Sequence, residues 1–188
     1  MFDEVIADAG QVIGSGLPAA ALLAGLAGAL LGYQRLAGLT GWPRWATLGL
    51  LASVVPIVAL TAVPTGPLVP GSAAAERLRG FFDAVRYLPW PDLRELGSYA
   101  EGRANVALFV PAAFFLTVAC RRAWPAVLLG PALSLTIECG QAFDAWRSLD
   151  PMDLVHNSVG AWLGALAGIA VLLVRFGAGL VYDHRHAQ

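Results

Sequence analysis

Hydrophobic residues run in long blocks along this chain, and polar residues gather in the intervals between the blocks. About five blocks approach the roughly twenty apolar residues that a helix needs to cross a bilayer. They cover residues 13–34, 45–65, 104–120, 124–143 and 154–175. The pattern predicts an all-α fold, a polytopic membrane helical bundle with about five transmembrane helices. One domain is expected to comprise residues 1–188.

The connections between the blocks differ in length. Those after Leu36 and after Cys120 are short, which favours helical hairpins. The connection at about 66–103 is long, contains several prolines and carries charges of both signs. It is therefore expected to be an extended, partly ordered surface loop.

Composition supports the membrane interpretation and excludes one class of partner. Hydrophobic residues make up 57% of the chain and charged residues only 13%, far from the average of soluble proteins. The formal net charge of −1 provides no general attraction to a polyanion. No nucleic-acid partner is expected, whereas membrane lipids are.

Arginines in short loops predict the orientation, because such residues favour the cytoplasmic side. With five crossings, the first short loop, the connection after the third block and the end of the chain share one side. That side is predicted to be cytoplasmic, so the C-terminus is inside and the acidic N-terminus outside. The long loop also carries arginines, but long loops weigh less in this rule. The short-loop and C-terminal arginines are Arg35, Arg44, Arg121, Arg122, Arg175 and Arg185.

Polar residues interrupt the last two blocks, and counting crossings brings them to one side of the membrane. The fourth block starts inside near Trp124, so fourteen residues at about 1.5 Å each lift Glu138 about 21 Å, into the outer third of the hydrocarbon. Asn105 begins the third block at the same side, and Asp153 lies at the entrance of the fifth. This convergence holds for either absolute orientation. The predicted polar cluster consists of Asn105, Glu138, Gln141, Arg147, Asp150, Asp153 and Asn157.

Structural roles explain part of this cluster. Asp150 precedes Pro151, as expected of a helix N-cap followed by proline in the first turn. A carboxylate in hydrocarbon costs about 2.5 to 3.5 kcal/mol on insertion scales, so Glu138 should face the bundle interior and have a partner. Arg147 is the nearest basic residue along the chain. An ion-paired network that locks the helices and a cleft that binds a polar group are both compatible with the pattern.

Catalysis is a further alternative. Glu138 and Asp153 are the candidate catalytic residues, as general acid and base. Their spacing matches no strong metal motif, and no metal or other cofactor is expected. His156 is interpreted as structural, and no serine or cysteine nucleophile pairs with it, so acyl transfer is weakly supported. The residues leave open whether the protein is an enzyme.

Glycines at four-residue spacing occur in the first and the last block. They leave flat helix faces on which another helix can pack closely. The favoured interpretation is packing inside one bundle, and the alternative is a homo-oligomer. The glycines are Gly25, Gly28, Gly32, Gly160, Gly164 and Gly168.

The order of these residues resembles the VanZ-like family. Its pattern has Asn followed by Pro in one helix, Glu-x-x-Gln at the end of the next, and then Arg, Asp, Asp, Asn and Gly. The resemblance covers residues 103–170 most closely, and Ala113 stands where family members usually have glycine. The corresponding residues here are Asn105, Pro111, Glu138, Gln141, Arg147, Asp150, Asp153, Asn157 and Gly160.

The resemblance implies a bacterial inner-membrane protein with a role in resistance to the glycopeptide teicoplanin. Combined with the polar cluster, it leads to the hypothesis of an outer-leaflet cleft that binds a cell-envelope lipid, a cell-wall lipid precursor or a lipoglycopeptide. One alternative is an enzyme that acts on a lipid-linked substrate through Glu138 and Asp153. Another is a structural or partner-binding membrane module, in which the cluster serves folding alone.

Overall fold

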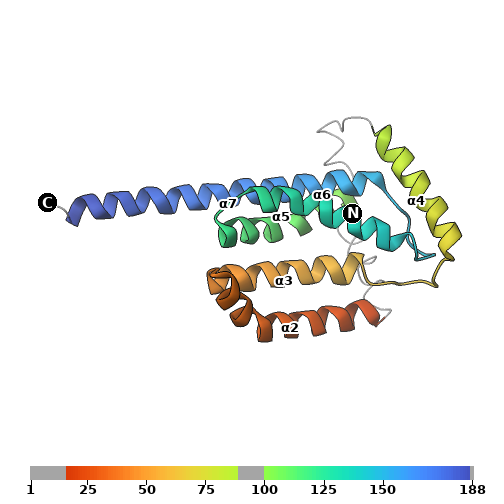
Figure 1. The fold of residues 1–188 in the computed structure, drawn as a ribbon, viewed down its shortest axis with the longest axis horizontal. Coiled ribbons are helices and arrows are strands. Elements are labelled where there is room, and N and C mark those ends of the chain that lie inside the picture. The colour runs from red at the N-terminus through yellow and green to blue at the C-terminus, as the bar shows by residue number, and fades with distance from the viewer. Residues whose placement is uncertain (1–15, 89–99, 187–188) are drawn as a thin grey trace.

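The computed structural model describes residues 16–88 and 100–186, with side chains as far as residue 177. Within these ranges the chain is all-α. The helices other than α4 run along one common axis, and α4 lies across one end of them (Figure 1). The helices are α2 (Leu17–Thr40), α3 (Arg44–Thr61), α4 (Gly71–Arg86), α5 (Ala100–Cys120), α6 (Trp124–Gln141) and α7 (Pro151–His186).

Four helices are long and apolar enough to cross a membrane. They are α2, α3, α5 and the part of α7 from Pro151 to Gly177. The fourth predicted span, 124–143, corresponds to α6, which is not among these four. This helix has 18 residues and ends in the polar residues Glu138 and Gln141. It still runs antiparallel to α5 and α7 along the bundle axis, so the chain alternates direction as predicted (Figure 1).

Part of the connection at 66–103 is helical. It contains α4, a 16-residue helix whose buried residues Ala74 and Phe81 face the rest of the molecule. Alternation of apolar and charged residues explains this amphipathic helix. Residues 89–99 lie outside the described ranges, as does the acidic N-terminal segment.

Small residues allow the helices to approach closely. The largest helix interface joins α5 and α7. A Cβ atom added at Gly160 would lie 2.3 Å from the backbone oxygen of Val106, and one at Gly164 would lie 2.1 Å from that of Val110. The glycines of α7 therefore pack against α5 inside the bundle, as the favoured interpretation predicted. On α2, by contrast, Gly28 and Gly32 have nothing within 4 Å of such an atom.

Buried side chains between the helices are mostly small or branched. One cluster of Ile57, Phe109, Ala112 and Ile137 joins α3, α5 and α6. A second cluster, made entirely of alanines, joins α5, α6 and α7. Lipid offers no hydrophobic driving force between helices, so close packing of this kind supplies much of the attraction. The result is a bundle that holds the ends of α5, α6 and α7 together.

Candidate functional site

Glu138 lies at the centre of the polar end of the bundle. Its side chain is 1% exposed on α6. The backbone N–H of Asp150 donates a hydrogen bond to Glu138 Oε2 at 3.2 Å. The carboxylates of Asp153 and Asp150 are close enough to interact electrostatically with that of Glu138. The turn between α6 and α7 thus brings three acidic side chains together.

Asn105 connects this acidic group to α5. Its side-chain Nδ2 donates to Asp153 Oδ1 over 2.6 Å. Glu101, one turn earlier on α5, also interacts electrostatically with the Asp153 carboxylate. The predicted meeting of the third, fourth and fifth blocks at one end is therefore realised through Asn105, Glu138 and Asp153.

One helical turn deeper, a second polar contact joins α6 and α7. Asn157 Nδ2 donates to Ser134 Oγ at 2.9 Å, and both side chains are buried. Asn157 Oδ1 has no hydrogen-bond donor among the residues that the structure describes. Ser134 was absent from the predicted cluster, although its spacing of four residues from Glu138 places both on one face of α6.

His156 packs against α5 and takes no part in the contact between Asn157 and Ser134. Its side chain is buried, and neither ring nitrogen has a hydrogen-bond partner within the described part of the chain. A Cβ atom at Gly102 would lie 2.5 Å from His156 Nε2. Glycine at 102 therefore makes room for the imidazole ring, in keeping with a structural role for His156.

Gln141 and Arg147 hold the end of α3. Gln141 Nε2 donates to the backbone oxygen of Thr61, and Arg147 Nη2 donates to that of Leu60, each at 2.8 Å. The last carbonyl groups of a helix lack intrahelical partners, and a cation is favourable near them. Arg147, which chain position offered as the counter-ion of Glu138, thus contacts a helix C-terminus instead. These two hydrogen bonds join the end of α6 and the α6–α7 connection to the end of α3.

Asp144 organises the α6–α7 connection, and sequence reasoning missed it. Its Oδ2 accepts from the backbone N–H of Thr65 at 2.7 Å, and its Oδ1 accepts from that of Trp146 at 2.9 Å. Burial of this carboxylate disfavours its charge, but the backbone N–H groups of Thr65, Trp146 and Gly66 outweigh it and lower the pKa of Asp144 below its ordinary value. No periodic pattern predicts such a loop residue, because its partner Thr65 lies 79 positions away.

Arg77 fixes α4 to the same connection. Its Nη1 donates to the backbone oxygens of Ala142 and Asp144, both at 2.8 Å, and its Nη2 donates to that of Arg147. Reciprocal backbone hydrogen bonds also join the two connecting segments, from Val69 to Phe143 and from Ala145 to Pro67. At the end of the bundle that carries the carboxylates, hydrogen bonds therefore join the α3–α4 and α6–α7 connections to each other and to α4.

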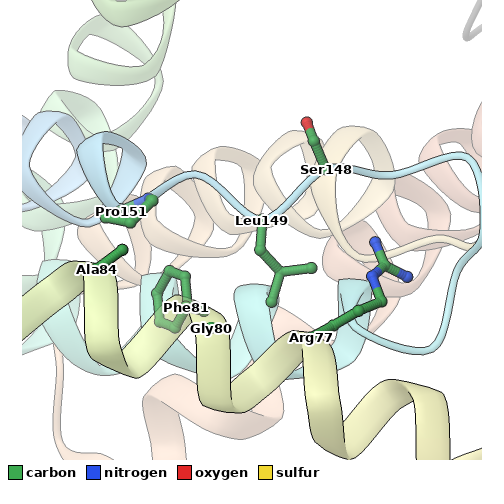
Figure 2. A pocket seen from close by; sticks show the side chains of 7 residues that line it. All are labelled: Arg77, Gly80, Phe81, Ala84, Ser148, Leu149 and Pro151. Carbon is green, nitrogen blue, oxygen red and sulfur yellow. The ribbon is translucent and has the colours of Figure 1, made fainter.

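A pocket of about 330 Å³ lies between α4 and the segment that enters α7. The Phe81 ring and the Leu149 side chain point toward one another across it, and Arg77 extends from α4 toward the segment (Figure 2). The lining residues are Arg77, Gly80, Phe81, Ala84, Ser148, Leu149 and Pro151.

The chemistry of this end is set by its acidic side chains. Within the described residues, no three His, Cys, Asp or Glu side chains are placed to hold a metal ion together. Glu138 and Asp153 instead present carboxylate oxygens supported by one amide side chain and one backbone N–H. Such groups accept hydrogen bonds and attract a cationic or hydroxyl-bearing partner.

Helices of this length and hydropathy, arranged antiparallel, define a multi-pass helical membrane protein. The model of the VanZ/LLP1 family matches residues 45–174, well over half of the chain. The chain belongs to this family. The match begins in α3 and so extends further toward the N-terminus than the resemblance at 103–170. Neither the comparison with curated proteins nor that with solved structures found a match.

Proposed function

We propose that this VanZ/LLP1 family protein binds a cell-envelope lipid, or a lipoglycopeptide, at the end of the bundle formed by α5, α6 and α7. The observation that carries the proposal is the meeting of Glu138, Asp150 and Asp153 at that end with Asn105. Ionisable side chains within a membrane protein are costly, and they commonly mark a functional site. A head group with hydroxyl or amine donors would pair with the exposed Asp150 and the half-buried Asp153, beside the buried Glu138.

Members of the polar cluster differ in their partners, and this difference supports the proposal. Gln141 and Arg147 have assigned partners on α3, which explains them as structural residues. Glu138, by contrast, receives one backbone hydrogen bond and faces two further carboxylates. Arg147, the basic residue nearest to Glu138 along the chain, donates to the Leu60 backbone oxygen. The oxygen atoms of these carboxylates can accept hydrogen bonds from the donors of a head group.

The setting we propose is a bacterial inner membrane with the polar end facing outward. There the site would meet envelope lipids, cell-wall lipid precursors and lipoglycopeptides such as teicoplanin. Retention of such a molecule would reduce susceptibility to teicoplanin.

The test uses Glu138→Gln and Asp153→Asn, which keep size and most hydrogen bonding but remove charge. Each is expected to lower affinity for the bound lipid by about tenfold or more, since hydrogen bonds to charged groups contribute about 1.5–3 kcal/mol. Lipid retained by the purified protein is measured by mass spectrometry, and teicoplanin susceptibility is measured in a host that expresses each variant.

Asp83→Asn is the matched control, because Asp83 is an exposed carboxylate on α4 that belongs neither to the cluster nor to the pocket lining. It should leave both measurements unchanged. If Glu138→Gln and Asp153→Asn accumulate normally and retain lipid and resistance, the proposal fails and the cluster serves folding. Conversion of a lipid-linked precursor by the unaltered protein, lost in both variants, would replace binding by catalysis.

A further inference from the structure

The pocket beneath α4 lies next to the start of α7, the last of the candidate membrane-spanning helices. Pro151 is both the first residue of the candidate span in α7 and part of the pocket wall. The other wall is α4, which crosses the end of the bundle instead of following its axis (Figure 1). A membrane spanned by α7 would therefore begin near this pocket, beside the segment whose Asp150 N–H bonds to Glu138.

Its walls suit an amphiphile. Phe81, Ala84, Leu149 and Pro151 are apolar, while Arg77 lies at one end of the opening (Figure 2). The hydrogen bonds of Arg77 go to neutral backbone oxygens, and it makes no ion pair with any of the described residues. Its positive charge therefore complements an anionic group, such as a phosphate, next to the apolar walls.

We infer that this pocket holds the upper acyl-chain segment of a membrane phospholipid, between Phe81 and Leu149, with the lipid phosphate near Arg77. The inference rests on the proposed function and adds to it the apolar subsite of the same end. Acyl chains are the apolar groups that such a membrane supplies near the pocket, and the apolar walls exclude a free polar head group as the occupant. Because Leu149 and Pro151 flank Asp150, the occupied pocket and the carboxylates share one backbone segment.

The inference is tested with a phospholipid that carries a photoactivatable diazirine near the ester end of one acyl chain. The full-length protein is reconstituted in nanodiscs, irradiated and digested, and the labelled peptides are identified by mass spectrometry. Saturable labelling of residues 77–84 and 148–151, displaced by excess unlabelled phospholipid, is expected.

Ala84→Phe should fill the pocket and lower labelling of these peptides by about tenfold. Ala75→Phe is the matched control, because Ala75 is exposed on α4 but does not line the pocket. It should leave labelling unchanged. Gly80→Leu is an independent filling variant, because nothing lies within 4 Å of a Cβ atom at Gly80. Gly80→Leu replaces Ala84→Phe in this test if Ala84→Phe does not fold.

The outcomes separate this inference from the proposed function. Labelling that does not saturate, or that is equal in the filled and control variants, indicates annular lipid only. Either result overturns the inference that the pocket holds an acyl chain. If lipid retention still depends on Glu138 and Asp153 in that case, the proposed function stands without the pocket. If the protein binds neither a lipid nor a lipoglycopeptide saturably, both are overturned.

Discussion

Glycine in α7 occupies positions where the backbone of α5 comes too near for any side chain. At Gly164, the Val110 backbone oxygen lies 2.1 Å from where a Cβ atom would be. Backbone atoms cannot rotate aside, so a methyl group there must separate the two helices. The spacing of Gly160, Gly164 and Gly168 predicted a flat face, and the partner of that face is α5.

Gly164→Ala is expected to destabilise the protein by roughly 1–3 kcal/mol, as overpacking does. Thermal unfolding in a mild detergent measures the effect. Gly28→Ala is the matched control, because α2 leaves open space around Gly28. A loss of stability in the control equal to that of Gly164→Ala would show that helix glycines matter here for a reason other than contact with α5.

Asp144 is expected to make the free energy of unfolding depend on pH. The pKa of Asp144 is lower in the folded protein than in the unfolded chain. As the pH falls toward the ordinary pKa of an aspartate, the unfolded state therefore binds more protons than the folded state. The stabilisation is therefore complete above that value and is lost as the pH decreases through the folded pKa. Unfolding measured between neutral and strongly acidic pH should show this loss.

Asp144→Asn should remove that part of the acid dependence and lower stability at neutral pH, since an amide nitrogen cannot accept from Thr65 or Trp146. Hydrogen exchange of residues 65–69 reports whether the loop pair has separated. An unchanged acid profile in Asp144→Asn would show that other carboxylates dominate acid unfolding.

A side chain on α7 supplies a hydrogen-bond donor where proline interrupts α6. Pro131 lacks the N–H that would bond to the backbone oxygen of Val127. Trp162 on α7 donates its Nε1–H to that oxygen at 3.3 Å. The α6–α7 contact is also close here, because a Cβ atom at Gly130 would lie 2.7 Å from Ala161 Cβ. An indole on one helix thus replaces a backbone donor missing from the other.

Trp162→Phe is expected to cost about 1 kcal/mol, since it leaves the Val127 oxygen without a donor. In a Pro131→Ala background, the restored backbone N–H should satisfy Val127, so that Trp162→Phe costs much less. A double-mutant cycle of unfolding free energies measures this coupling. Additive effects of the two changes would contradict the compensation.

The bundle as assembled makes an odd number of passes along its axis. α2 begins at the end where α4 lies, and α7 ends at the opposite end, beyond the other helices (Figure 1). The two ends of the described chain are therefore expected on opposite sides of the membrane, with the carboxylates and α4 on the side where α2 begins. The arginine pattern predicts that this side is outside.

A fluorescent reporter fused after Gln188 should be active in the cytoplasm. Ser72, exposed on α4, is changed to Cys in a chain whose Cys120 and Cys139 are replaced by serine. A membrane-impermeant maleimide added outside the cells should label Ser72→Cys. Labelling only after the membrane is opened, with the reporter active outside, would reverse the orientation but keep the odd number of passes.

Hydrophobic blocks were sufficient to predict an all-α membrane bundle, because a chain in lipid must satisfy its backbone groups within each helix. Counting crossings also predicted that Asn105, Glu138 and Asp153 lie at one end, since helix direction alternates with each pass. Helix α4 was not predicted, although its alternation of apolar and charged residues is visible in retrospect. A short amphipathic helix is stabilised mainly by its contacts, and Arg77 and Phe81 contact a segment distant in sequence.

The sequence alone thus determined the membrane class, the course of the chain and the end at which its polar residues gather, all of which follow from local hydrophobicity and periodicity. Only the tertiary structure decided which polar residues face one another. It directs Gln141 and Arg147 to the end of α3, leaves Glu138 with Asp150 and Asp153, and closes the connecting loops through Asp144 and Arg77. The physical reason is that a hydrogen bond depends on distance in space and direction, which spacing along one chain does not specify for partners in another helix.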